Sequence, residues 1–314
     1  MSHSASQDSP SRPARLRRSV LSVPASNRRA LDKLSSLDCD AVIFDLEDSV
    51  SPEKKAEARE NLRTFFLASP LPGKERIIRI NALSSNFGAD DLALVTELEP
   101  DAVLLPKVDE PQNVTGVSDR LAEADAPESL RIWAMIETPR GILNAASIAE
   151  AGRTAGSRLD CFVVGLNDLR KETGVLPQPG RAYLVPWLMQ VVLAVSAYGL
   201  EAIDSVLNDF KDDAAFEAEC GQGRIMGFAG KMLIHPNQIE AANRHFGPDE
   251  AAIAEAEAII SAFAEPGADA LNVVNLGGRM VERLHLVQAE RLVHKARLIE
   301  QRSSGAAGTP RSDV

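Results

Sequence analysis

The sequence predicts an α/β protein, a (β/α)8 TIM barrel with a C-terminal helical appendage. Eight short apolar runs rich in β-branched residues alternate with longer segments of helical period. Strands joined by helix-length crossovers run parallel, and eight such repeats close most economically into a barrel. A doubly wound open sheet is the alternative. It would normally bring a glycine-rich phosphate turn after the first strand, and LSVPASNRR contains none.

The elements follow one another regularly along the chain. The expected strands span residues 19–24, 41–47, 76–81, 102–108, 131–137, 159–166, 201–207 and 230–235. Most of the gaps are expected to hold one amphipathic helix, for example at 53–67 and at 181–197. The glycine-spaced stretch GQGRIMG lies between a helix and a strand, so it is interpreted as a helix terminus and turn rather than as a nucleotide-binding motif.

The two ends of the chain are poor in large apolar residues, so residues 1–15 and 302–314 are expected to be disordered tails. Asp8 and two prolines make an organelle transit peptide the less favoured interpretation of the start. The barrel is assigned to 16–265, with an Ala-rich helix at 248–263. After the break at Pro266-Gly267, leucines among Arg and Glu predict a helical lid or oligomerisation segment over 266–301.

Composition narrows the classes of function. A formal net charge of −11 argues against a general nucleic-acid binder, which needs clustered Lys and Arg. The three cysteines, Cys39, Cys161 and Cys220, are widely separated, so neither a zinc site nor a disulfide framework is indicated. No apolar run is long enough to cross a bilayer, and the start lacks the apolar core of a secretory signal. A cytoplasmic protein without a membrane partner is expected.

Ionisable and polar residues gather where the expected strands end. Active sites of (β/α)8 barrels lie at the C-terminal ends of the strands, so these residues are expected to share one rim. They are Asp45, Glu47, Asp48, Arg79, Asn81, Lys107, Glu137, Asn167, Asp168, Asp204 and His235. A helix cap or a buried ion pair is the favoured interpretation of Asp48 and Asp204 taken singly.

Several carboxylates in one pocket are costly unless a metal ion or a charged ligand compensates them. Carboxylates without a matching set of His and Cys favour a hard ion, and Mg²⁺ is commonly held by one or two carboxylates plus waters. Arg79 suits bidentate recognition of a carboxylate. The sequence therefore indicates an anionic, oxygen-rich substrate and Mg²⁺ as cofactor.

Seven stretches resemble, in the correct order, the citrate lyase β-subunit-like and malyl-CoA lyase-like family. They are RRSVLSVPASN (17–27), FDLEDSVSPEKKAEAR (44–59), RIN (79–81), LLPKV (104–108), IETPRGILN (136–144), VGLNDLRKETG (164–174) and GFAGKMLIHPNQI (227–239). The resemblance spans about residues 16 to 300. It implies a Mg²⁺-dependent (β/α)8 barrel, commonly a homotrimer, that acts on CoA thioesters of hydroxy acids.

The resemblance also implies roles for individual residues. It makes Glu137 and Asp168 the Mg²⁺ ligands and Arg79 the group that binds the carboxylate of the keto-acid fragment. Other members contact CoA phosphates at the positions of Arg18, Lys54 and Lys55; for the two lysines, a solvated helix face is an equal alternative. The remaining rim groups expected to serve catalysis or substrate binding are Asp45, Glu47 and Lys107.

Two positions depart from the family pattern. Many relatives have an acidic pair where this chain has Asn167-Asp168, so one carboxylate beside the expected metal ligand is absent. Relatives often read DGKMID near the C-terminus and lend an acidic residue to the neighbouring subunit's site. Here the segment reads GGRMVE, which aligns Glu282 with that acid. Glu282 is therefore a candidate acid/base group, and a surface glutamate is the alternative.

The leading functional hypothesis is a Mg²⁺-dependent carbon–carbon lyase for a small 3-hydroxyacyl-CoA such as citramalyl-, malyl- or citryl-CoA. In cleavage, a base takes the hydroxyl proton, the C–C bond breaks and the thioester becomes an enolate. Alternatives are a malyl-CoA thioesterase, a metal-dependent aldolase for free hydroxy-keto acids, and a catalytically degenerate CoA-binding subunit. Binding of CoA separates the aldolase from the others, and turnover separates the degenerate subunit.

Overall fold

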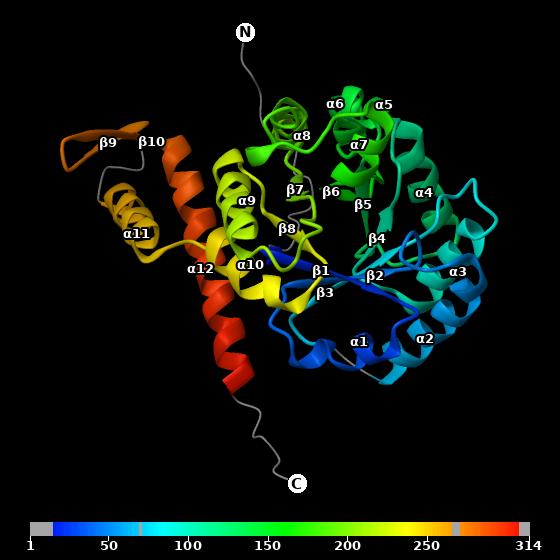
Figure 1. Ribbon diagram of the computed structural model, residues 1–314. Coiled ribbons are helices and arrows are strands. Elements are labelled where there is room, and N and C mark those ends of the chain that lie inside the picture. Colours follow the sequence, from blue (N-terminus) through cyan, green and yellow to red (C-terminus); the bar gives the residue numbers. More distant parts are fainter. Residues whose placement is uncertain (1–14, 69–70, 266–270, 308–314) are drawn as a thin grey trace. The chain divides into compact units, whose positions relative to one another are not determined.

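The computed structural model describes residues 15–68, 71–265 and 271–307, with side chains described as far as Arg302 (Figure 1). The expected tail at 1–15 and the end of the chain from 308 lie almost wholly outside the described residues. The chain divides into two compact units, one from Arg17 to Phe246 and one that begins at Gly247. No helix of the described residues is long and apolar enough to cross a membrane.

The first unit is a closed barrel of eight parallel strands, which confirms the predicted fold. Each strand pairs with the next along the chain, and β8 closes the ring on β1 through Ser19 with Lys231 and Val20 with Met232. The strands are β1 (Ser19–Pro24), β2 (Ala41–Asp45), β3 (Glu75–Arg79), β4 (Ala102–Leu105), β5 (Arg131–Ile136), β6 (Leu159–Val164), β7 (Glu201–Asp204) and β8 (Gly230–Leu233).

Helices surround the barrel and fill the gaps between its strands (Figure 1). They are α1 (Arg28–Asp32), α2 (Lys55–Ala68), α3 (Gly88–Leu98), α4 (Pro111–Glu123), α5 (Pro139–Leu143), α6 (Ala145–Ala151), α7 (Leu166–Thr173), α8 (Val185–Tyr198), α9 (Asp213–Met226) and α10 (Ile239–Phe246), with 3-10 turns η1 (Leu34–Ser36), η2 (Pro52–Lys54), η3 (Pro179–Arg181) and η4 (Pro236–Gln238). The expected helix at 181–197 begins only at Val185. Arg181 has φ 54°, a left-handed backbone that a helix start does not accept.

The side chains of each strand alternate between two buried layers, as the pleat of a strand requires. On β2, Val42 and Phe44 pack into the layer between strands and helices, whereas Ala41 and Ile43 pack inside the barrel. Trp133 on β5 is fully buried in the inner layer. Because these residues fill the interior, the barrel is a packed core and its chemistry is confined to its ends.

A buried arginine fills the N-terminal end of the barrel. Arg17 precedes β1, and its guanidinium bonds to both carboxylate oxygens of Glu75, at 2.7 and 2.8 Å, and to Asp160 and Glu201. Its Cζ lies 4.8 Å from the centroid of the Trp133 ring. Burial opposes the charged form, but the three carboxylates outweigh it and raise the pKa of Arg17. This cluster therefore closes the end of the barrel away from the C-terminal rim.

The second unit contains α11 (Glu250–Ala264), a hairpin of β9 (Val273–Leu276) and β10 (Arg279–Glu282), and the long α12 (Arg283–Ala307). Its small core joins Ala256 to Ala289 and Val293. The hairpin was not predicted; its turn uses Gly277 and Gly278, both at positive φ. Helix α12 runs past residue 302, where the tail was expected to begin, and its buried residues Ala289, Val293 and Ala296 lie on one helical face.

Candidate active site at the C-terminal mouth of the barrel

A cavity of about 300 Å³ opens at the C-terminal ends of the barrel strands. One part of its wall carries acidic side chains from β2, β5 and α7, and Arg79 from β3. The acidic members are Asp45, Asp48, Glu137 and Asp168. Among the described residues that line this cavity, Arg79 is the one cationic side chain. The wall therefore has an excess of negative charge that favours a bound cation.

Arg79 ends β3 and is held by the end of β2. Its Nε and Nη2 donate to the two Asp45 oxygens at 2.6 and 2.5 Å, and its Nη1 lies 3.2 Å from Glu47 Oε2. Burial raises the pKa of the Asp45 carboxyl, but Arg79 outweighs burial and holds that pKa below its usual range. Because Asp45 occupies one edge of the guanidinium, a substrate carboxylate would use the remaining Nη protons.

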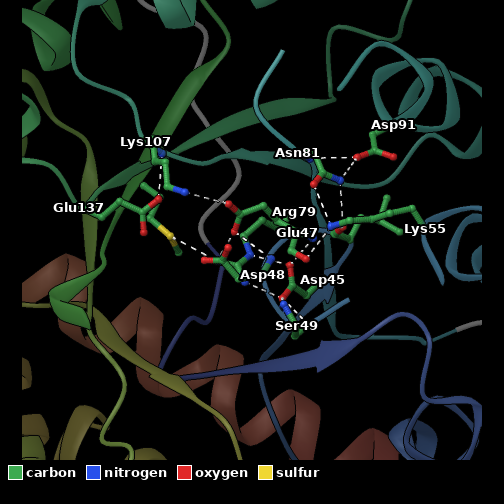
Figure 2. A network of polar contacts seen from close by, with 12 residues as sticks. Asp45, Glu47, Asp48, Ser49, Lys55, Arg79, Asn81, Asp91, Lys107 and Glu137 are labelled. Atoms are coloured by element: carbon green, nitrogen blue, oxygen red, sulfur yellow. Dashed lines mark hydrogen bonds and ion pairs between the residues drawn. The ribbon is translucent and has the colours of Figure 1, made fainter. Parts of the chain in front are cut away.

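The loop after β2 fixes this ion pair. The backbone N–H of Glu47 donates to Asp45 Oδ1 at 2.8 Å, and the Ser49 hydroxyl donates to the other oxygen. Figure 2 shows Arg79 with Asp45 and Glu47 between Lys107 and Glu137 on one side and Lys55 and Asn81 on the other. The structure thus brings the expected residues from β2, β3, β4 and β5 into one connected network.

Glu137 follows β5 and is 2% exposed. Its Oε1 accepts the backbone N–H of Lys107 at 2.9 Å. Lys107 adopts φ 51°, and this left-handed backbone directs its N–H toward Glu137. Burial raises the pKa of Glu137 to about 8, with further contributions from the negative charges of Glu47 and Asp168. In the absence of a cation, this carboxyl therefore holds a proton near neutral pH.

Gly165, between β6 and α7, leaves the space that Glu137 occupies. A Cβ at this position would lie 2.5 Å from Glu137 Oε2 and 2.6 Å from Glu137 Cβ. No side chain fits there unless Glu137 moves. The VGLND stretch therefore needs glycine at position 165, because the backbone there passes close to the Glu137 carboxylate.

Asp168 lies in the first turn of α7 and lines the same cavity as Glu137. The start of α7 is fixed on both sides. Gly165 N–H donates to Ile136 O at 3.1 Å, and Leu166 N–H donates to Ser205 Oγ at 3.1 Å. The two expected metal ligands therefore come from successive strands and share one cavity wall.

The donor set of this wall fits Mg²⁺ better than it fits zinc. The described residues contain no group of three or more His, Cys, Asp or Glu side chains placed to hold a metal, so a closed zinc-type site is not formed by them. Two carboxylates on an open cavity match the way proteins hold Mg²⁺, which keeps waters and takes substrate oxygens. The buried Glu137 carboxyl with its raised pKa is the group that such an ion would compensate.

Two residues expected to contact CoA phosphates form hydrogen bonds within the protein instead. Arg18 lies at the N-terminal end of β1, buried, with Nε and Nη2 each 2.8 Å from Asp40. Lys55 is buried, and its Nζ donates to Leu46 O, Glu47 O and Asn81 Oδ1 at 2.7 to 2.8 Å. Arg18 therefore has a structural partner at the N-terminal end of the barrel, and every Nζ proton of Lys55 has an acceptor. These contacts argue against a CoA contact at either residue, which stays a prediction.

The other expected residues have different outcomes. Lys54 is exposed in η2, and Glu282 is exposed at the end of β10 in the second unit; their roles stay predictions. Lys107 contributes its ammonium to Glu47 at 3.4 Å as well as its backbone N–H to Glu137. Asp204 is buried against Arg181 and Lys231, the ion pair that was favoured for it.

Sequence reasoning missed several residues of the cavity wall. Asn208 follows β7, and Met232 and Ile234 belong to β8 and its exit. Ser205, the first residue after β7, also lines the cavity and anchors α7. The sequence offered one indication of these residues, which is that each lies within a few residues of the C-terminal end of a strand.

Fold and site together define a (β/α)8-barrel enzyme with an acidic active-site wall at its C-terminal mouth. The family model described as HpcH/HpaI aldolase/citrate lyase matches residues 18–236. The chain belongs to the HpcH/HpaI aldolase/citrate lyase family, and this confirms the predicted resemblance and the prediction of a citrate lyase-type enzyme.

Named relatives match nearly the whole chain. A (3S)-malyl-CoA thioesterase of Cereibacter sphaeroides is 42% identical over 282 residues, covering 90% of this chain and 95% of the relative. The mitochondrial citramalyl-CoA lyase of Homo sapiens is 31% identical, covering 91% and 87%. A crystal structure of the protein CitE from Mycobacterium tuberculosis, in complex with magnesium, acetoacetate and coenzyme A, is similar with a TM-score of 0.70 at 27% identity, covering 90% and 99%.

Proposed function

We propose that this protein is a Mg²⁺-dependent carbon–carbon lyase for a small 3-hydroxyacyl-CoA, which it splits into an acyl-CoA and a keto acid. The observation that carries the proposal is the cavity wall on which Glu137 and Asp168 stand with Arg79. The names of the citramalyl-CoA lyase and malyl-CoA thioesterase relatives support a CoA thioester as substrate. The magnesium in the CitE complex supports the metal.

The residues divide the work of the reaction. Glu137 and Asp168 would hold Mg²⁺, and Arg79 would bind the carboxylate of the keto-acid fragment through the Nη protons that Asp45 does not accept. When bound, Mg²⁺ supplies positive charge for the oxygen that becomes the keto group. Asp45 and Glu47 keep Arg79 charged and in place. Glu282 is the proposed acid/base group, which the family resemblance implies is lent to the active site of a neighbouring subunit.

The proposed cleavage of the hydroxyacyl-CoA proceeds in three steps. A base takes the hydroxyl proton, the C–O bond becomes a carbonyl, and the neighbouring C–C bond breaks. Its electron pair forms the enolate of the thioester, which a proton converts into the acyl-CoA. The malyl-CoA thioesterase relative favours hydrolysis of a thioester as an added or alternative activity, because that reaction uses the same substrate class. A homotrimer and a CoA contact at Lys54 stay predictions.

The test is incubation of the protein with Mg²⁺ and a panel of 3-hydroxyacyl-CoA esters, with products identified by mass spectrometry. We expect acetyl-CoA or propionyl-CoA together with a keto acid, and no products after chelation of the metal. Free CoA plus the intact hydroxy acid, with no keto acid from any ester, would show a thioesterase in place of a lyase. Cleavage of free hydroxy-keto acids but of no ester would show the aldolase. Tight CoA binding without any turnover would show a degenerate subunit, and each of these results contradicts the proposed lyase.

The affinity for Mg²⁺ is expected to rise with pH. A metal binds the ionised carboxylate, and the pKa of Glu137 in the metal-free protein is about 8. Below pH 8, binding must therefore displace a proton, so Kd should rise up to about tenfold for each pH unit that the pH falls, and should level off above pH 8. Calorimetry in two buffers that differ in ionisation enthalpy measures the proton released. A Kd that is constant between pH 6 and 8 contradicts this assignment.

A further inference from the structure

Two asparagines on neighbouring elements form a reciprocal amide pair at the cavity. Asn167 in α7 donates from Nδ2 to Asn208 Oδ1 at 3.1 Å, and Asn208 donates from Nδ2 to Asn167 Oδ1 at 2.8 Å. Both residues line the cavity, and Asn167 directly precedes the proposed metal ligand Asp168. After these two bonds, each amide retains one N–H for another acceptor.

Contacts of Phe210 with His235 and Asn237 hold the loop that carries Asn208. Phe210 stacks on His235 with ring centroids 4.6 Å apart and planes 12° from parallel. Asn237 Nδ2 donates to the backbone carbonyl of Phe210 at 2.9 Å, and His235 Nδ1 is 2.7 Å from Asn237 Oδ1. Asn208 is therefore presented by an ordered loop, which is what a preorganised hydrogen-bond donor needs.

The cavity has a charged part and a neutral part. The strands that precede β6 contribute Asp45, Asp48, Arg79 and Glu137, whereas β7 and β8 and their exits contribute neutral residues. The neutral members are Ser205, Val206, Asn208, Met232 and Ile234. Because the strand order is sequential, these two parts face each other across the mouth. The amide pair joins Asn208 on the neutral part to Asn167 in α7, which directly precedes Asp168.

We propose that the free N–H groups of Asn167 and Asn208 bind the thioester oxygen of the substrate. This inference rests on the proposed function and specifies which substrate group faces the neutral wall. A free carboxylate would meet no cationic side chain among the described residues of this wall, and Asp168 would repel it. A thioester carbonyl is uncharged and needs only N–H donors. The pair therefore selects a thioester over a free acid.

The same donors serve the reaction. When the C–C bond breaks, its electron pair forms the carbon–carbon double bond of the enolate, and the thioester oxygen takes the negative charge. Donors already directed at that oxygen stabilise the charge as it develops, without rearrangement. A proton then adds to carbon and restores the carbonyl. Asn167 is itself uncharged, so it donates to this oxygen without adding a negative charge beside it.

The experiment compares the binding of acetyl-CoA with that of S-ethyl-CoA, a thioether of similar size without the carbonyl oxygen, in the presence of Mg²⁺. The wild-type protein is expected to bind acetyl-CoA about three- to tenfold more tightly, the range of one net hydrogen bond. Asn208→Ala should abolish the difference and lower kcat for the acyl-CoA substrate about tenfold or more. Asn86→Ala, a change of an exposed asparagine on the loop after β3 that does not line the cavity, should keep both values.

The outcomes separate this inference from the proposed function. Equal binding of the two ligands by the wild-type protein, or a thioester preference that survives in Asn208→Ala, overturns the role of the amide pair and leaves the lyase proposal intact. Failure to bind either ligand overturns the proposed function instead. If the pair only ties the loop after β7 to α7, Asn208→Ala should lower the Tm and weaken the binding of both ligands alike. Mg²⁺ affinity should stay within about twofold of wild type, because Glu137 and Asp168 are unchanged.

Discussion

Replacement of Glu137 by glutamine is expected to lower turnover of the acyl-CoA substrate by on the order of a thousandfold, equivalent to about 4 kcal/mol of transition-state stabilisation. Glutamine has the same shape, so it fits beside Gly165 and its carbonyl can still accept the Lys107 N–H. It lacks the charge that holds a cation. The loss should therefore be chemical rather than structural, with weaker Mg²⁺ binding and an unchanged Tm.

Steady-state kinetics and calorimetric titration with Mg²⁺ measure these effects. Glu172→Gln is the matched control, because Glu172 is exposed on α7, the helix that carries Asp168. It removes one negative charge from the same helix and should leave kcat near the wild-type value. If Glu137→Gln binds Mg²⁺ as tightly as the wild-type protein does, Glu137 is not a metal ligand, and the proposed site must be abandoned.

Replacement of Arg17 by alanine is expected to lower the free energy of unfolding by about 3 to 5 kcal/mol, the usual cost of removing one partner of a buried ion pair. Arg17 is 5% exposed, and the side chains of its partners Glu75 and Asp160 are 2% and 9% exposed. The substitution leaves these carboxylates buried without the guanidinium that contacts them. It also removes the cation that lies over Trp133.

Urea denaturation followed by circular dichroism measures this change. Arg63→Ala is the control, since Arg63 pairs with Glu97 on the surface, where the two side chains are 36% and 48% exposed. That change should cost less than about 1 kcal/mol. A loss of the same small size for Arg17→Ala would mean that the cluster at the end of the barrel contributes nothing to stability. Mg²⁺ binding by the folded variant should be retained, because the cavity lies at the other end.

The barrel was predictable because its signals are local. Each strand is a short apolar run that both of its faces bury, and the charged residues after it mark the C-terminal rim. The same reasoning placed Asp45, Arg79, Glu137 and Asp168 together, and all four line one cavity. Strand ends were overextended: polar Glu47 and Asn81 were assigned to strands that end at Asp45 and Arg79, since the chain leaves the ladder where the rim begins.

The misplaced and missed residues depend on partners far away in the sequence. The sequence alone does not indicate that Arg18 pairs with Asp40 or that Lys55 reaches the carbonyls of the loop after β2. Asn208 was missed because its pairing with Asn167 joins residues 41 positions apart in the sequence. The hairpin of β9 and β10 escaped notice because its strands are short and largely exposed, so they have no strong apolar period.

The filled N-terminal end of the barrel limits how ligands can enter and leave the cavity. With Arg17 and its carboxylates beneath Trp133, the cavity has no passage through the barrel axis. If the proposed lyase reaction takes place in this cavity, the substrate enters and both products leave by the one opening at the C-terminal mouth.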